Sequence, residues 1–301
     1  MIRFVISATV LGFSLTGVSL AESPIAENAE LQTLAMDFKF TEGPIADADG
    51  NVYFTDQPND RIMKWDTQGK LSTFLKPSGR SNGLFFDLDG SLLACADEKN
   101  ELWSISMDGK HKVLISDFEG KLLNGPNDLW VHPNGSLYFT DPLYKRPYWK
   151  RGTKSEQDGQ HVYRLSADRQ TLIRADEKLV QPNGIVGTPD GKHLYVADIR
   201  DKKTYVYDIA PDGTLNNRKL FCSQGSDGMT IDSAGNVYLT GNGVTIYDKM
   251  GKKIGHIELK GTWTANVCFG GADRTTLFIT ATKGLYSIAM KTCGVGPTPK
   301  N

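Results

Sequence analysis

Residues 126–141 read PNDLWVHPNGSLYFTD, and the plan of this stretch occurs six times along the chain. Each copy has a polar anchor residue, an apolar run, a turn and a second run of β-branched and aromatic residues. Such runs, separated by turn residues, predict paired β-strands. The other five copies are TEGPIADADGNVYFTD (41–56), SNGLFFDLDGSLLACAD (81–97), PNGIVGTPDGKHLYVAD (182–198), SDGMTIDSAGNVYLTG (226–241) and ANVCFGGADRTTLFITA (265–281).

The spacing of the copies predicts the fold. The six anchors, 40, 45, 56, 44 and 39 residues apart, are Glu42, Asn82, Asn127, Asn183, Asp227 and Asn266. One four-stranded propeller blade has about this length, whereas the repeats of a parallel β-helix, the competing fold, are shorter. In the first five copies a glycine follows the anchor by eight residues, and in four of them it belongs to an Asp-Gly or Asn-Gly pair. Such pairs supply the positive φ of a tight hairpin. We therefore expect an all-β, six-bladed β-propeller.

Further strands complete each blade. A third strand is expected in runs such as RIMKWD and ELWSIS, and a shorter fourth in LSTFLK and KVLIS. Because a ring of blades must close, residues 31–40 are expected to add a strand to the last blade. The 56-residue spacing indicates an insertion after Asp141, over residues 142–160.

The N-terminus predicts export. In residues 1–21, Arg3 precedes an apolar stretch and Ala21 precedes the expected cleavage at Glu22, as in a signal peptide. An uncleaved membrane anchor is the alternative. Residues 22–301 are then expected to form a single propeller domain, periplasmic or secreted and free of the membrane, with its oligomeric state left open.

Composition and cysteine spacing exclude some functions. The chain of 301 residues has 34 Lys plus Arg against 35 Asp plus Glu, so it has no electrostatic footprint for nucleic acid. The four cysteines form no CxxC pair and have no closely spaced histidine, so neither a zinc site nor a redox motif is indicated. The sequence leaves the disulfide state of Cys95, Cys222, Cys268 and Cys293 open.

The anchors are candidate ligands. In a propeller the innermost strand of each blade lines the central channel, so six equivalent residues should form a ring at one mouth. Asn82 and Asn266 have an alternative explanation, because Asn side chains bond to nearby backbone and start turns. Glu42 is a poor turn former, so a ligand role explains it better. Carboxylate and amide oxygens that converge on one axis suit a hard divalent cation such as Ca²⁺, with Mg²⁺ or Mn²⁺ as alternatives.

The motifs around the anchors resemble the gluconolactonase and regucalcin (senescence marker protein) family of six-bladed propellers. The resemblance covers most of the mature chain and depends on TEGP (41–44), GPNDLWVHPNGSLYFTDP (125–142), QPNGIVGTPDG (181–191) and GSDGMTID (225–232). It implies that the metal ligands are Glu42, Asn127, Asn183 and Asp227, that Asn127 also meets substrate, and that Asp227 is the general base. No anchor is a His or Cys, which argues against zinc, but enzymes of this kind can accept several ions, so Zn²⁺ stays an alternative. Gly125 stands where the animal branch has a sugar-binding Arg, so lactone hydrolysis is implied more firmly than gluconolactone as substrate.

The inserted segment is the second candidate for substrate binding. Its aromatic residues Tyr144, Tyr148 and Trp149 alternate with cationic residues such as Arg146. If the segment folds over the channel mouth as a lid, Tyr144 and Arg146 offer ring stacking and positive charge to a small-molecule substrate. The alternative is an ordinary basic surface loop.

The leading functional hypothesis is therefore a metal-dependent lactonase. A cation polarises the ester carbonyl while Asp227 activates water or attacks as a nucleophile. Two alternatives stay open: an organophosphate-type esterase with the same groups, and a non-catalytic carbohydrate- or protein-binding propeller with a structural Ca²⁺ ion.

Overall fold

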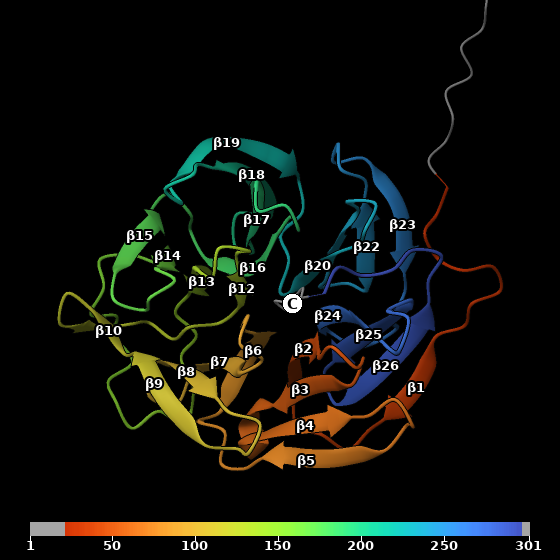
Figure 1. Cartoon of the computed structure of the whole chain (residues 1–301), viewed down its shortest axis with the longest axis horizontal. Coiled ribbons are helices and arrows are strands. Elements are labelled where there is room, and N and C mark those ends of the chain that lie inside the picture. The colour runs from red at the N-terminus through yellow and green to blue at the C-terminus, as the bar shows by residue number, and fades with distance from the viewer. Residues whose placement is uncertain (1–21, 297–301) are drawn as a thin grey trace, which may run out of the picture.

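The computed structural model describes residues 22–296, and these residues form six four-stranded antiparallel sheets arranged as a ring (Figure 1). We call the sheets blades 1 to 6 in chain order. In each blade the first strand lies next to the channel and the fourth at the outside of the ring. The six-bladed propeller predicted from the repeat is confirmed.

Blades 1 to 3 occupy the first part of the ring. Blade 1 comprises β2 (Thr41–Ala46), β3 (Val52–Asp56), β4 (Arg61–Trp65) and β5 (Leu71–Leu75), with a short 3-10 helix at Gln57–Asn59. Blade 2 comprises β6 (Ser81–Phe86), β7 (Leu92–Ala96), β8 (Glu101–Ile105) and β9 (His111–Ile115). A small hairpin of β10 (Asp117–Phe118) and β11 (Lys121–Leu122) follows. Blade 3 comprises β12 (Leu129–Val131), β13 (Leu137–Asp141), β14 (His161–Leu165) and β15 (Leu172–Asp176).

Blades 4 to 6 complete the circle. Blade 4 comprises β16 (Pro182–Gly187), β17 (His193–Asp198), β18 (Lys203–Ile209) and β19 (Leu215–Cys222). Blade 5 comprises β20 (Met229–Ile231), β21 (Val237–Leu239), β22 (Val244–Tyr247) and β23 (Lys253–Ile257). Blade 6 comprises β24 (Thr264–Gly270), β25 (Thr276–Ala281), β26 (Gly284–Ala289) and the N-terminal strand β1 (Gln32–Ala35).

Strand β1 closes the ring, as expected from residues 31–40. It pairs antiparallel with β26, so the red and blue ends of the ribbon lie side by side in Figure 1. Apolar packing closes the same junction, because one core cluster joins Phe54 of blade 1 to Cys268 and Phe278 of blade 6. Similar clusters fill the spaces between other blades, and the core therefore lies between the sheets.

The turn chemistry of the repeat is also confirmed. In blade 1 the Asp47 carboxylate accepts the N–H groups of Asp49 and Asn51, and Gly50 takes a φ of 88°. This left-handed conformation favours glycine. The later glycines at the same repeat position, Gly90, Gly135, Gly191 and Gly235, also have positive φ.

The predicted signal peptide, residues 1–21, lies outside the described residues. Across residues 22–296, no helix is long and apolar enough to cross a membrane. The four cysteines are unpaired, and all but Cys293 are buried.

Candidate functional site

The anchors lie where the innermost strands begin, and local irregularities set their direction. In blades 1, 2, 4 and 6 the pairing of the first two strands shifts register beside the anchor. A β-bulge of this kind re-aims a side chain that regular pairing would direct into the sheet. In blades 3 and 5 the anchors Asn127 and Asp227 precede the strands β12 and β20 by two residues.

A glycine after most anchors brings neighbouring blades together. A Cβ on Gly43 would lie 2.2 Å from the carbonyl oxygen of Asn82 in the next blade, and one on Gly228 only 1.9 Å from the Asn266 side chain. Gly83 and Gly184 approach Asn127 and Asp227 in the same way, at 2.5 and 2.8 Å. Because these glycines have no Cβ, consecutive anchors can lie close together in one ring.

The Asp227 carboxylate accepts hydrogen bonds from two other side chains at this ring. Its Oδ1 accepts a hydrogen bond of 2.8 Å from Asn183 Nδ2, and its Oδ2 accepts one of 2.5 Å from the indole of Trp263. Asn183 Nδ2 also donates to the Tyr144 hydroxyl at 2.8 Å. Burial raises the pKa of Asp227, whereas these hydrogen bonds and the Arg146 charge lower it. Over the whole residue, Asp227 is half-buried.

Glu42 and Asp128 add two buried carboxylates to the ring. Burial raises the pKa of Glu42 well above its ordinary value, and the charges of Asp227 and Asp128 raise it further. Burial also raises the pKa of Asp128 to about 8, although Leu129 N–H and Asn266 hydrogen-bond to it. Close, buried like charges are costly unless a cation or protons compensate them.

Two amide oxygens of the ring have no hydrogen-bond partner in the described part of the chain. Among the described residues, Oδ1 of Asn82 and Oδ1 of Asn183 are buried and accept no hydrogen bond. Over the same residues, no three His, Cys, Asp or Glu side chains are grouped to hold an ion, so such a site would depend on amide oxygens as well. Oxygen ligands of this mixture suit Ca²⁺ or another hard divalent cation.

A side-chain bond to nearby backbone is found at one of the two anchors for which a turn was the alternative, but it lies within strand β24 and starts no turn. Asn266 Oδ1 accepts the N–H of Val267 at 2.8 Å, and its Nδ2 donates to Asp128 at 3.3 Å. Asn82 Oδ1 makes no such bond. Asn127 is buried in the same ring, where its carbonyl accepts the N–H of Gly83 at 2.7 Å.

The inserted segment, residues 142–160, reaches the ring at its N-terminal end. Tyr144 bonds to Asn183, and the Arg146 guanidinium stacks 5.2 Å from the Tyr144 ring centre. Of the candidate substrate residues, Tyr144 is thus linked to Asp227 through Asn183, and the charge of Arg146 lowers the pKa of Asp227. Trp149 is buried, with its indole bonded to the carbonyl oxygen of Asp97.

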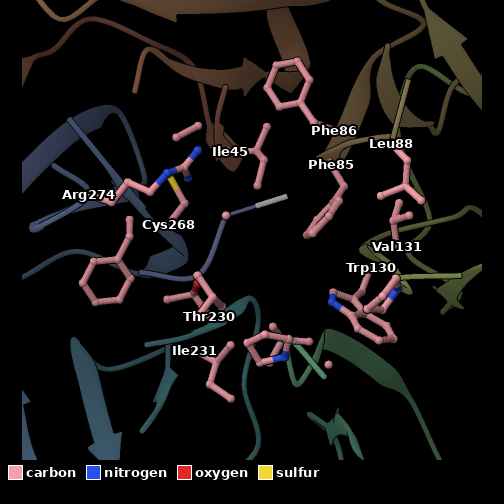
Figure 2. Close-up of a pocket in the computed structure, with 18 residues that line it drawn as sticks. Ile45, Phe85, Phe86, Leu88, Trp130, Val131, Thr230, Ile231, Cys268 and Arg274 are labelled. Atoms are coloured by element: carbon pink, nitrogen blue, oxygen red, sulfur yellow. The ribbon is translucent and has the colours of Figure 1, made fainter. Parts of the chain in front are cut away.

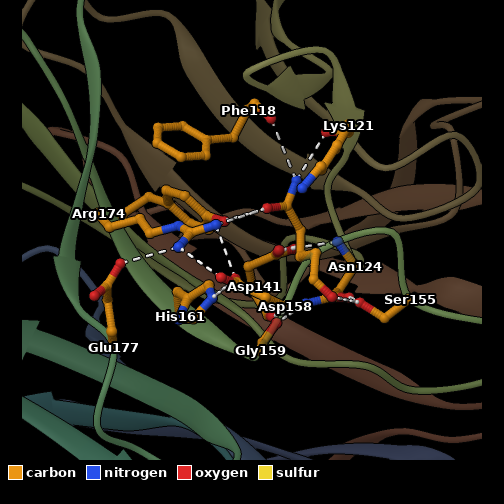
Figure 3. A network of polar contacts seen from close by, with 12 residues as sticks. Phe118, Lys121, Asn124, Asp141, Ser155, Asp158, Gly159, His161, Arg174 and Glu177 are labelled. Carbon is orange, nitrogen blue, oxygen red and sulfur yellow. Dashed lines mark hydrogen bonds and ion pairs between the residues drawn. The ribbon is translucent and has the colours of Figure 1, made fainter.

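The C-terminal end of the same segment is fixed elsewhere. Gln157 Nε2 donates to the carbonyl oxygen of Lys121, and Asp158 pairs with His161 and Arg174 (Figure 3). Arg174 also pairs with Glu177. These contacts tie the segment to blade 3 and to the β10–β11 hairpin, away from the anchors.

The other end of the channel contains a different kind of cavity. It has a volume of about 310 Å³ and is lined by residues near the far ends of the innermost strands, such as Phe85, Trp130 and Ile231 (Figure 2). Among residues 22–296, Arg274 is the one charged residue that lines it. Its mostly apolar walls contrast with the ring of carboxylates and amides at the anchor mouth.

Three residues at the anchor mouth were not predicted from sequence. Trp263 precedes the repeat copy of blade 6, Asp128 follows an anchor directly, and Asp97 ends the copy of blade 2. The Asn-Asp pair at residues 127–128, where four of the other five copies have a glycine after the anchor, was a visible signal for Asp128. No pattern pointed to Trp263 or Asp97, because their roles depend on contacts between blades.

Fold and site together define a six-bladed propeller with a ring of carboxylates and amides at one channel mouth. The family model described as SMP-30/Gluconolactonase/LRE-like region matches residues 40–283. The chain belongs to this family.

Individual relatives agree with this assignment. A gluconolactonase of Zymomonas mobilis is 32% identical, over 88% of this chain and 82% of its own. A gluconolactonase structure from Xanthomonas campestris is 28% identical with a TM-score of 0.82, covering 89% of this chain and 91% of its own. A calcium-binding regucalcin from Agrobacterium tumefaciens, 19% identical, shares the fold at a TM-score of 0.75, over 94% of this chain and all (100%) of its own.

Proposed function

We propose that this protein is a metal-dependent lactone hydrolase with Asp227 as its general base or nucleophile. The observation that carries the proposal is the position of Asp227. Asp227 is a half-buried residue whose carboxylate is held by Asn183 and Trp263 at the channel mouth, beside the buried carboxylate of Glu42. The gluconolactonases among its relatives support a small-molecule lactone as the substrate.

Glu42, Asn183 and Asp227 are the proposed cation ligands, with Asn127 as a fourth. The unpartnered Oδ1 of Asn183 and the mutual repulsion of Glu42 and Asp227 support this assignment. Ca²⁺ is the first candidate, with Mg²⁺, Mn²⁺ or Zn²⁺ as alternatives. When bound, the cation supplies Lewis-acid polarisation of the lactone carbonyl and stabilises the developing oxyanion.

The chain's own chemistry is proton transfer by Asp227. As general base, one Asp227 oxygen takes a proton from the water that adds to the lactone carbonyl carbon. The ring C–O bond then breaks, and the same proton returns to the ring oxygen to give a hydroxy acid. As nucleophile, Asp227 would instead form an acyl intermediate that water later hydrolyses.

Residues around Asp227 orient the substrate in this proposal. Tyr144 and Trp263 present aromatic groups to the space over the carboxylate, since each is hydrogen-bonded within the Asn183–Asp227 unit. The Arg146 guanidinium offers hydrogen bonds to a ring or carboxylate oxygen, and Asn127 lies on the ring below. Each group acts by binding, so its loss should raise KM more than it lowers kcat.

The coordination of the bound ion would distinguish an enzyme from a binding module. A structural ion has a closed set of ligands, whereas a catalytic one keeps an open position. Phosphoester hydrolysis would use the same residues and is separated by substrate profile. We further propose that the protein acts after export, in the periplasm or outside the cell, on the basis of residues 1–21.

The test is a pH-indicator screen of sugar, aliphatic and aromatic lactones and of phosphoesters, with and without a chelator. Asp227→Asn keeps a ligating oxygen and the side-chain volume but removes basicity. At saturating Ca²⁺ it should reduce kcat by about 10² to 10⁴. A kcat near the parent value would mean that another group is the base. Absence of any chelator-sensitive hydrolysis by the parent would favour the binding module.

A further inference from the structure

An aspartate ends the second strand in three blades and directly follows it in blade 2. The three that end a strand make the same kind of contact. Asp56 accepts the backbone N–H groups of Lys39 and Phe40, at 2.9 and 3.3 Å. Asp198 accepts those of residues 180 and 181 at 2.6 and 3.0 Å, and Asp141 those of residues 124 and 125 at 2.9 and 2.8 Å. Each aspartate thereby fixes the segment that leads into the innermost strand of its own blade.

Asp97 of blade 2 occupies the same repeat position but makes different contacts. The following residue repeats the pattern of the other blades, since Glu98 N–H donates to the carbonyl of Gly79 as Gln57 N–H does to Phe40. The entry segment of blade 2, however, is fixed by Asp60. Its carboxylate accepts the N–H groups of residues 78 and 80 at 2.9 and 2.8 Å. The Asp97 carboxylate is therefore not needed for this task.

Asp97 instead holds the inserted segment of blade 3. Its Oδ2 accepts hydrogen bonds from Arg146 Nε at 3.1 Å and from the Tyr148 hydroxyl at 2.6 Å. Its backbone carbonyl accepts the indole N–H of Trp149 at 3.1 Å. With a relative exposure of only 3%, the carboxylate makes these charge-assisted bonds with little competition from water.

The bond to Nε leaves the two terminal amino groups of the Arg146 guanidinium available for other hydrogen bonds. Within residues 22–296, the Arg146 guanidinium makes no other hydrogen bond to protein, so its terminal amino groups remain free. Its charge still acts on Asp227. Gly125 makes the arrangement sterically possible, because a Cβ at that position would lie 2.6 Å from Asp97 Oδ1.

We propose that Asp97 is a positioning residue that holds Arg146 and Tyr144 over the channel mouth for substrate binding. Asp97 fixes Arg146 and Tyr148, Arg146 stacks on Tyr144, and Tyr144 bonds to Asn183. The aspartate at this repeat position thus holds a segment of the neighbouring blade in blade 2, whereas its equivalents bond within their own blades. The proposal rests on the proposed lactone hydrolase function for its kinetic part but not for its structural part.

The test compares Asp97→Asn with Tyr148→Phe and with Asp158→Asn as a matched control. Asp158 belongs to the same segment but bonds only at its far end, to His161 and Arg174 (Figure 3). Asp97→Asn should raise KM about tenfold or more while kcat stays within about threefold, since a charge-assisted clamp is lost but no reacting group is removed. Tyr148→Phe should raise KM by a smaller factor, and Asp158→Asn should leave it unchanged.

Limited trypsin digestion tests the clamp without any substrate. The exposed Lys145, Lys150 and Lys154 lie in the segment, so mass spectrometry can assign cleavage there. Asp97→Asn should speed this cleavage about tenfold, and Tyr148→Phe less. Cleavage as slow as in the parent would overturn the proposal. Faster cleavage with unchanged KM would overturn the substrate role of the segment, and a parent without lactonase activity would refute the proposed function while this digestion still decides the clamp.

Discussion

The metal-free protein should lose stability as pH rises, and Asp128 should cause much of this loss. Burial raises the pKa of Asp128 to about 8, against about 3.9 in an unfolded chain. Between these values the folded state binds one proton more than the unfolded state, so the free energy of unfolding falls with increasing pH. The slope is about 1.4 kcal/mol per pH unit, which gives about 3 kcal/mol between pH 5 and pH 7.

Urea unfolding at pH 5, 6, 7 and 8 in the presence of a chelator measures this slope. Asp128→Asn mimics the protonated carboxyl, so its unfolding free energy should depend much less on pH and should exceed that of the parent at pH 7. A residual slope of the same sign is expected from Glu42, whose pKa is also raised. Parallel pH profiles for parent and Asp128→Asn would refute the assignment of the slope to this carboxyl.

Two further predictions concern the ring of anchors. Glu42→Gln should weaken Ca²⁺ binding by 10²-fold or more, which is about 2.8 kcal/mol at 1.4 kcal/mol per tenfold. Asn82→Ala should weaken it by less than tenfold, because no charge is removed. Equal losses of affinity in calorimetric titrations would show that the ring acts collectively. Gly228→Ala places a Cβ 1.9 Å from the Asn266 side chain and should lower the free energy of unfolding by about 1 to 3 kcal/mol, while Gly152→Ala, with no heavy atom within 4 Å, serves as the neutral control. A Gly228→Ala melting temperature equal to that of the control would contradict the close approach of the anchors.

The fold could be predicted from sequence because every blade repeats the same local pattern of strand and turn residues. The turn at Gly50 depends on residues within the hairpin, namely the Asp47 carboxylate and the freedom of glycine at positive φ. Closure by β1 follows from the count of strands once six blades are assumed. Such local and topological rules need no knowledge of contacts between distant residues.

The candidate site could be predicted only in part. Glu42 stood out because it breaks the Asn and Asp pattern of the anchors. The bulges that direct the anchors are absent from the sequence pattern, since they arise from pairing between strands. Trp263 also escaped prediction, because its contact with Asp227 joins a loop before blade 6 to blade 5.

The four strand-end aspartates show why the remaining part could not be predicted. Asp56, Asp97 and Asp141 follow similar β-strands, and nothing in their local sequence distinguishes a backbone clamp from a clamp on a neighbouring loop. The difference at Asp97 arises because Asp60 has already taken the N–H groups of the entry segment, and because the inserted segment of the next blade brings donors within reach. A buried carboxylate must be hydrogen-bonded, but its sequence position does not select the donors. In a repeat protein, a residue whose repeat-specific partner is already satisfied elsewhere is therefore available for a new function.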